Sequence, residues 1–374
     1  MESTKRVLSI QSHVVHGYVG NKAATFPLQL LGWDVDAINT VQFSNHAGYR
    51  SHGGSKTDKT QLQDIFSILE KNEFHHTNAL LTGYVPGAEG LSAVADFAAR
   101  LRTANPDLIF LLDPVMGDDG RMYVADDVLP IYRDRLLPLA TIITPNWFEV
   151  ELLTKIELTS RDSLRSALKI LHTILGVRHV VITSVVVRRG SQLLADILQA
   201  GFETAKIPAT NGVSKDDFVQ DEFILCVSSS ASDDPNATPK VHALAVPRIK
   251  GYFSGVGDLF SALVLAHFDP SSSLESTTPS TTRLSRAAAR ALHTTHSVLR
   301  RTQEHALKLA ADASSAYTDD ELDSNEPLQR VRRMRTRELR IVQSREDILA
   351  IGDGRVEVPE MKPWDNFWEG VQTG

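Results

Sequence analysis

The sequence predicts an α/β fold in which helices cover both faces of a mostly parallel central sheet. Short apolar runs alternate with amphipathic helical patterns over the first two-thirds of the chain, and this alternation is typical of parallel sheets. The apolar content of 42% and the charged content of 23% are those of a globular protein. A chain of 374 residues is long enough for one large domain of this class.

The predicted strands are short and apolar, and the helical segments between them carry one apolar face. We expect strands at residues 7–11, 34–39, 79–82, 108–112, 141–143 and 180–183. We expect helices at residues 24–31, 61–70, 91–104 and 161–175. Polar residues follow most of the strands, where open α/β sheets bind ligands; they are Ser12, Gly83, Tyr84, Asp113, Thr144, Asn146 and Ser184.

The domain organisation is simple. We expect one domain over residues 1–350 and a C-terminal tail over residues 351–374, with polar insertions at about 201–247, 270–282 and 311–327. The first insertion predicts a small β-flap with a mobile tip and strands at residues 223–227 and 241–246. The tail contains Trp364, Phe367 and Trp368, and the sequence leaves open whether it packs on the domain.

Charge and cysteine content narrow the function classes. A net charge of −7 argues against a nucleic-acid partner, and six arginines between residues 330 and 340 fit a solvated helix face paired with nearby acids. No apolar stretch approaches membrane-spanning length, so we expect no membrane partner. The single cysteine, Cys226, cannot form an intrachain disulfide, which fits a reducing compartment. We expect a cytoplasmic protein, with the nucleus as a further location.

Residues 253–260 (FSGVGDLF) place a glycine turn directly before an apolar helical run. Bare glycines at 255 and 257 let a phosphate oxygen approach main-chain N–H groups, and the start of a helix adds partial positive charge. Asp258 lies in the first helical turn. A carboxylate beside an anion site makes chemical sense if it takes a proton from a hydroxyl that attacks the phosphate. An ordinary N-cap before a core helix is the alternative.

Two further segments supply carboxylates directly after predicted strands. Residues 113–118 (DPVMGD) place Asp113 and Asp118 on one tight loop, and residues 144–149 (TPNWFE) open a helix. Phosphoryl transfer from ATP needs Mg²⁺, which takes one or two carboxylates plus substrate oxygens. A solvated Asp-Pro turn and simple helix capping are the alternatives. The histidines, His46 among them, lack metal-ligand spacing, so we expect structural or solvent-facing roles for them.

Other nucleotide-binding signatures are absent from the sequence. It contains neither the phosphate loop G-x-x-x-x-G-K-[ST] nor the motifs of protein kinases. The glycines between residues 48 and 54 lack the strand-to-helix context of a dinucleotide fingerprint. A nicotinamide-dependent dehydrogenase is therefore poorly supported.

Together these segments resemble the pyridoxal kinases, a branch of the ribokinase-like fold. The matching stretches are residues 9–29 (SIQSHVVHGYVGNKAATFPLQ), 41–46 (VQFSNH), 81–84 (LTGY), 113–118, 122–124 (MYV), 142–146 (IITPN), 181–184 (VITS) and 255–258 (GVGD). A later match at residues 340–344 (RIVQS) implies a final strand. The resemblance covers most of the chain and implies ATP-dependent phosphorylation of the 5′-hydroxymethyl group of pyridoxal, pyridoxine or pyridoxamine.

The resemblance also implies a role for each matched residue. Asp258 would be the general base. The vitamin would contact Ser12, Val41, Phe43, Ala47, Tyr84 and Asp258. ATP would contact Asp113, Asn146, Glu149, Thr183, Ser184, Ile249, Lys250, Gly251, Gly255, Val256 and Gly257. Mg²⁺ would be bound by Asp118 and Glu149, and a monovalent cation, K⁺ or Na⁺, by Asp113 and Thr144. The family resemblance implies a homodimer as well.

Two positions depart from the family pattern, and two other functions stay open. Threonine is common in the family where this chain has Ala47 and Val256, and we expect these changes to alter affinity or closure over ATP rather than abolish the reaction. The chain could instead be a hydroxymethylpyrimidine or sugar kinase of the same fold, or a non-catalytic vitamin-binding protein. Ser12, Tyr84 and residues 41–46 favour a pyridine substrate, and the intact glycine turn with Asp258 favours an enzyme.

Overall fold

The computed structural model describes residues 5–49, 51–202, 218–232, 234, 236–270, 281–309 and 329–369. The expected insertion at 311–327 lies outside the described residues, and so does most of the one at 270–282. The tip of the expected flap is described only in part. Within the described ranges, no helix is both long and apolar enough to cross a bilayer.

A ten-stranded sheet forms the centre of the molecule, with the order β12-β11-β10-β9-β8-β5-β4-β1-β2-β3. Its parallel part consists of β1 (Lys5–Val14), β2 (Trp33–Phe43), β4 (Ala79–Thr82), β5 (Ile109–Leu112), β8 (Ile142–Ile143) and β9 (His179–Arg188). All six predicted strands are therefore confirmed, and so is the mostly parallel α/β fold. The short strand β3 (Gly54–Lys56) closes one edge by pairing antiparallel with β2.

Helices cover both faces of the sheet, because successive side chains of each buried strand point to opposite faces. One apolar core lies under α2 (Lys59–Lys71), α3 (Ala88–Ala104), α4 (Val128–Ile131), α5 (Trp147–Thr154), α6 (Arg161–Thr173) and α7 (Gln192–Gln199). The other lies under α1 (Asn21–Leu30), α8 (Val256–His267), α9 (Arg283–Leu309) and α12 (Arg345–Gly352). On β4, Leu80 belongs to the first core, whereas Ala79 and Leu81 belong to the second.

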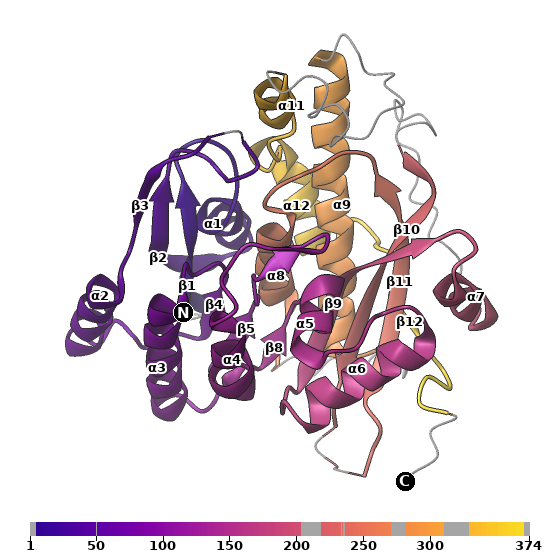
Figure 1. Cartoon of the computed structure of the whole chain (residues 1–374), viewed down its shortest axis with the longest axis horizontal. Helices are drawn as coiled ribbons and strands as arrows, with labels where there is room; N and C mark the ends of the chain where they lie inside the picture. The colour runs from indigo at the N-terminus through magenta and orange to yellow at the C-terminus, as the bar shows by residue number, and fades with distance from the viewer. Residues whose placement is uncertain are drawn as a thin grey trace.

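The strands expected in the flap are β10 (Phe218–Ser230) and β11 (Lys240–Ile249). They pair antiparallel with each other, and β10 pairs antiparallel with β9, so they continue the central sheet. Figure 1 shows them on the side of the molecule opposite β1, β2 and β3. The ends of these long strands carry residues 249–251 to the carboxyl edge of the parallel sheet.

The C-terminal segment packs onto the domain. Within it, β12 (Lys362–Pro363) pairs with β11, and the rings of Trp364 and Phe367 are buried in the first core. The indole N–H of Trp368 donates a hydrogen bond of 2.7 Å to the carbonyl of Pro239. The expected boundary between residues 350 and 351 falls inside α12.

The strand expected at residues 340–344 is wrong. Residues Val342–Ser344 form a 3₁₀ turn that leads into α12. The N–H of Ser344 donates to the carbonyls of Arg340 and Ile341, each at 3.0 Å, and its hydroxyl donates to Arg340 at 2.8 Å. Local hydrogen bonds of a serine therefore outweigh the β-propensity of the adjacent Ile-Val pair.

Candidate functional site

The expected site residues gather at the carboxyl edge of the parallel strands. Ser12 lies near the end of β1, Tyr84 follows β4, Asp113 follows β5, and Thr144 follows β8. After β1 the chain forms β2 on one side, and it later places β4 on the other side of β1. Such a change of direction opens a crevice at the carboxyl ends of the strands.

Ser12 lies inside β1 rather than after it, opposite a β-bulge of β2. The pairing of β1 with β2 shifts register between Gln11 and His13, so Ser12 alone opposes Thr40 and Val41 of β2. Gly20, which precedes α1, packs against Ser12, because a Cβ on Gly20 would lie 2.1 Å from the carbonyl oxygen of Ser12. Only glycine permits this approach, and it brings the start of α1 beside Ser12.

The glycine turn before α8 is equally constrained. Gly255 has φ of 81°, and a Cβ there would lie 1.9 Å from the carbonyl oxygen of Tyr18. The turn leads into the first turn of α8, where Asp258 accepts a hydrogen bond from the main-chain N–H of Gly20. Burial raises the pKa of Asp258, and the Gly20 hydrogen bond opposes part of that rise. A carboxylate with a raised pKa is better suited to accept a proton near neutral pH.

A second buried carboxylate, Asp113, lies close to the glycine turn. A Cβ on Gly257 would lie 3.8 Å from Asp113 Oδ2, and the hydroxyl of Ser261 donates to the same oxygen at 2.9 Å. The Ser261 hydroxyl also lies 2.8 Å from Thr144 Oγ1. Burial first, and then the charge of Asp258, raise the pKa of Asp113 to about 8, while the Ser261 hydrogen bond opposes the rise.

Glu149 closes the capping box that begins α5. Its carboxylate accepts hydrogen bonds of 2.9 Å from the N–H groups of Asn146 and Met116, and Asn146 Oδ1 accepts the N–H of Glu149 in return. The side-chain amide of Asn146 donates to the carbonyl of Gly117 at 2.8 Å. Burial and the charge of Asp113 raise the pKa of Glu149 well above its ordinary value. These bonds fasten the 113–118 loop to α5.

Asp118 lies on a hairpin formed by β6 (Gly117–Asp118) and β7 (Arg121–Met122). Its Oδ1 accepts the N–H of Asp119 at 2.9 Å, and Arg248 of β11 lies within electrostatic reach. Asp119 and Gly120 both have positive φ, as a two-residue hairpin turn requires. The Asp-Gly pair is the sequence signal for this hairpin.

The donors around Asp113 suit a bound cation, since hard cations prefer carboxylate and hydroxyl oxygens. Asp113 interacts electrostatically with both Asp258 and Glu149, and a positive ion would reduce that repulsion. The buried hydroxyl of Thr82, whose carbonyl accepts the N–H of Asp113 at 3.0 Å, has no hydrogen-bond partner among the described residues. Within the part of the chain that the structure describes, no group of three or more His, Cys, Asp or Glu side chains could hold a metal ion.

The residues expected to contact the vitamin differ in exposure. Val41 is buried at the end of β2, and Phe43 packs edge-to-face on His52 at 5.3 Å between ring centroids. Tyr84 is half-buried, and burial raises the pKa of its hydroxyl. Ala47 is exposed on the loop after β2. The structure thus presents one apolar wall beside β2 and one phenol after β4.

Apart from the glycine turn itself, the residues expected to contact ATP lie on or just after β5, β8, β9 and β11, on the other side of β4 from β1 and β2. The pairing of β9 with β10 shifts register between Ile182 and Val185, so Thr183 and Ser184 together oppose Cys226. Thr183 lies inside β9 as predicted, and its N–H donates to the carbonyl of Pro145 at 2.9 Å, whereas Ser184 also lies inside β9 and not after it as predicted.

At the end of β11, Ile249 is buried, and Lys250 and Gly251 just after it are exposed. Gly251 has φ of 108°, and a Cβ there would lie 3.0 Å from the guanidinium carbon of Arg337. The chain therefore passes close to the segment that follows α11 (Arg330–Thr336).

Two residues of this site escaped the sequence pattern. Ser261 connects Asp113 with Thr144, and its signal was a spacing of one helical turn from Asp258 on the same helix face. Gly20 donates a hydrogen bond to Asp258 from a distant part of the chain, and no local sequence pattern predicts that contact.

Comparisons with known proteins show which family the chain resembles. A family model described as phosphomethylpyrimidine kinase matches residues 37–215. The chain is similar to the pyridoxal kinase of Arabidopsis thaliana, with 35% identity over 92% of this chain and 91% of that protein. It is also similar to the pyridoxal kinase of Homo sapiens, with 34% identity over 93% and 96%, and to a putative pyridoxal kinase of Saccharomyces cerevisiae, with 43% identity over 70% and 73%.

Solved structures give the same result. The pyridoxal kinase of Leishmania donovani in complex with ADP and pyridoxine superposes with a TM-score of 0.71 at 31% identity, covering 96% of this chain and 99% of that one. Its complex with ADP and pyridoxamine gives a TM-score of 0.70 at 31% identity, with the same coverage.

Proposed function

The chain belongs to the pyridoxal kinase family, and from this premise we propose how its residues carry out the reaction. The protein phosphorylates B6 vitamers with ATP. The acceptor is the 5′-hydroxymethyl group that pyridoxal, pyridoxine and pyridoxamine share, and the products are the 5′-phosphate and ADP. The single observation that supports the mechanism best is the place of Asp258, in the first turn of α8 between the glycine turn and the N–H of Gly20.

Asp258 acts as the general base. Its carboxylate takes the proton of the 5′-hydroxyl, the freed oxygen bonds to the γ-phosphorus, and the bond between that phosphorus and the leaving ADP oxygen breaks. The hydrogen bond from Gly20 fixes the orientation of the carboxylate. Burial supports this role because it raises the pKa of Asp258 and so makes the group a stronger base.

The glycine turn stabilises the transferring group. Gly255, Val256 and Gly257 lie at the N-terminus of α8, where the main-chain N–H groups of a helix have no intrahelical partners. These donors and the helix dipole stabilise the negative charge that builds on the phosphoryl oxygens. Val256 keeps its N–H, so the loss of the threonine hydroxyl that is common in the family leaves the main-chain donors in place.

Two kinds of cation belong to the proposal. Asp118 and Glu149 would hold Mg²⁺, directly or through its water, and Asp113 and Thr144 would hold K⁺ or Na⁺. When bound, these ions neutralise the phosphate charge and align the phosphoryl group for in-line transfer. The link from Thr144 through Ser261 to Asp113 supports the second assignment, because it gathers three oxygen donors in one buried place.

Substrate binding divides between the two sides of the glycine turn. Ser12 and Tyr84 would hold the pyridine ring against the apolar wall of Val41 and Phe43, with Ala47 at its rim. The nucleotide would lie along the other side, in contact with Asn146, Thr183, Ser184, Ile249, Lys250 and Gly251. The sheet order supports this division, because β1 and β2 lie on one side of β4 whereas β5, β8, β9 and β11 lie on the other.

A substrate panel tests the function. Purified protein with MgATP is supplied in turn with pyridoxal, pyridoxine, pyridoxamine, 4-amino-5-hydroxymethyl-2-methylpyrimidine and ribose, and ADP formation is followed together with the phosphorylated product. We expect turnover with the three vitamers. The pyrimidine is included because the matching family model describes a phosphomethylpyrimidine kinase. Preference for the pyrimidine or for ribose, or pyridoxal binding without ADP formation, would contradict the proposal.

We also propose that the protein forms a homodimer in the cytoplasm or nucleus. Exposed Ile65 and Ile68 on one face of α2 support a contact between copies. The absence of any second cysteine for a disulfide supports a reducing compartment. Light scattering after gel filtration tests the dimer, and cell fractionation tests the location.

A further inference from the structure

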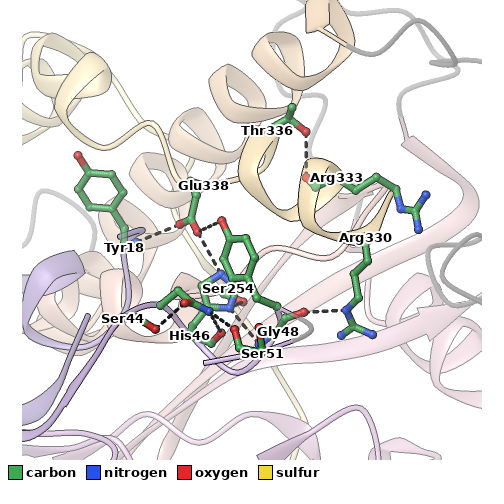
Figure 2. A network of polar contacts seen from close by, with 12 residues as sticks. Tyr18, Ser44, His46, Gly48, Ser51, Ser254, Arg330, Arg333, Thr336 and Glu338 are labelled. Atoms are coloured by element: carbon green, nitrogen blue, oxygen red, sulfur yellow. Dashed lines mark hydrogen bonds and ion pairs between the residues drawn. The ribbon is translucent and has the colours of Figure 1, made fainter. Parts of the chain in front are cut away.

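The carboxylate of Glu338, just beyond α11, joins two loops that are distant from it in the sequence. Its Oε2 accepts the N–H of Tyr18 at 3.1 Å, and its Oε1 accepts the hydroxyl of Tyr49 at 2.7 Å and lies 3.2 Å from His46 Nε2. Figure 2 shows Glu338 at the centre of these contacts. The side chains of Glu338 and His46 are only 12% and 9% exposed, so water competes little for these bonds.

The hydrogen bonds continue beyond His46 toward the glycine turn. The N–H of Gly48 donates to His46 Nδ1 at 3.1 Å, so Nδ1 is the acceptor and the ring proton sits on Nε2, facing Glu338. The hydroxyl of Ser254 lies 3.1 Å from the same Nδ1 and is therefore its donor. An ordered chain thus runs from Ser254 through His46 to Glu338.

Each loop in this network carries a residue of the proposed mechanism. Tyr18 lies two positions before Gly20, whose N–H bonds Asp258, and its carbonyl lies against Gly255. Ser254 directly precedes Gly255. His46 directly precedes Ala47 on the substrate side. A shift of Glu338 would therefore displace the base, the anion site and the substrate loop together.

The network is held firmly. A Cβ on Gly17 would lie 2.4 Å from Glu338 Oε2, so the first loop passes directly over the carboxylate. Arg330, on α11, donates from Nε to the carbonyl of Gly48 at 2.8 Å and fastens the second loop to the same segment. Burial alone would raise the pKa of Glu338, but the bonds from His46, Tyr49 and Tyr18 hold it below its ordinary value. The carboxylate therefore stays ionised at neutral pH.

We propose that Glu338 is a positioning residue for phosphoryl transfer, which aligns Asp258, the glycine turn and the substrate loop through Tyr18, His46 and Tyr49. The inference rests on the proposed function. Glu338 reaches the reaction only through these three residues. Its loss should slow the chemical step more than it weakens nucleotide binding, because Glu338 hydrogen-bonds Tyr18, His46 and Tyr49 and none of the residues expected to contact ATP.

Glu338→Gln tests the proposal with little change of shape. The amide oxygen can still accept from His46 or Tyr49, but the amide NH₂ then faces the N–H of Tyr18 and cannot accept from it. The matched control is Glu346→Gln, which removes one charge from an exposed glutamate on α12. Single-turnover formation of pyridoxal 5′-phosphate is measured at saturating pyridoxal and MgATP, together with the Kd of ADP and the melting temperature.

We expect Glu338→Gln to lower the single-turnover rate about 10–100-fold, the usual effect of misaligned reacting groups, and to leave the Kd of ADP at the value of Glu346→Gln. The unpaired N–H of Tyr18 should lower the melting temperature of Glu338→Gln below that of Glu346→Gln. Ser254→Ala therefore decides whether the rate loss reflects positioning, because it cuts the same chain of bonds at its other end. It should slow the single-turnover rate too, and the double variant should be no slower than Glu338→Gln alone.

Three results would overturn the inference. The first is a single-turnover rate of Glu338→Gln equal to that of the unaltered protein. The second is a double variant in which the rate losses of Glu338→Gln and Ser254→Ala multiply, and the third is a rate loss that is matched by an equal loss of ADP affinity. Absence of turnover in the unaltered protein would instead overturn the proposed function itself, so the two failures are distinguishable.

Discussion

The hydroxyl of Ser261 donates a hydrogen bond of 2.9 Å to Asp113, and Ser261 lies one helical turn beyond Asp258 on α8. One helix therefore presents both the proposed base and the hydroxyl that satisfies the neighbouring buried carboxylate. This arrangement keeps two mutually repelling carboxyl groups at a fixed separation, since α8 cannot move one partner without the other. The proposed cation site depends on the same bond.

Gly255→Ala should disable the anion site. The alanine would need φ of 81°, and its Cβ would lie 1.9 Å from the carbonyl oxygen of Tyr18, so the turn must shift. We expect turnover to fall strongly and the free energy of unfolding to fall by about 2 kcal/mol or more. Gly354→Ala is the control, because Gly354 also has positive φ, of 70°, but open space around it. Equal effects on both variants would refute the close-packed turn.

Glu149→Gln should weaken both the fold and the use of Mg²⁺. The present carboxylate accepts from Met116 with one oxygen and from Asn146 with the other, whereas an amide offers a single acceptor oxygen. One buried N–H is left without its partner, which costs about 1–3 kcal/mol of stability. Chemical unfolding measures that loss. A Mg²⁺ titration of turnover should shift to higher concentration, and an unchanged titration would remove Glu149 from the metal site.

Acid should destabilise the protein partly through His296. Burial, with help from Arg300 and His293, lowers the pKa of His296 to about 4 from 6.5. Between pH 6.5 and about 4, His296 is therefore protonated in the unfolded chain but not in the folded chain. The free energy of unfolding consequently decreases as pH falls from about 6.5 toward about 4.

His296→Gln should make that decline shallower, by up to about 3 kcal/mol for the full shift. Urea unfolding at a series of pH values measures it. His76→Gln, at an exposed histidine after α2, is the control, and parallel pH profiles for both variants would contradict the assignment.

The sequence pattern predicted the parallel strands because most of them contain short apolar runs; β4, β5 and β8 are buried along their whole length, whereas β2 is partly exposed. The pattern placed the ends of β1 and β9 too early, since Ser12 and Ser184 are polar and interrupt those runs, although both strands continue past the register shifts. The Ile-Val pair near residue 342 looked like a strand, but the bonds of Ser344 turn the chain instead.

Long-range contacts account for the parts of the site that the sequence did not predict. Ser261 meets Asp113 across 148 positions, and Glu338 meets Tyr18 across 320. Residues that are so far apart in the sequence form no local motif, so their contact is seen only in the folded chain. By contrast, the glycine turn and Asp258 were predictable, because anion binding at a helix start requires small residues in consecutive positions.

The most direct test of the mechanism is the turnover of Asp258→Asn with pyridoxal and MgATP, measured beside its Kd for ADP. Asparagine keeps the size of the side chain but cannot take the proton of the 5′-hydroxyl. We expect kcat to fall by about 10²–10⁴, the usual effect of losing a general base, with the Kd for ADP and the melting temperature unchanged. Turnover close to that of the unaltered protein would show that Asp258 is not the base.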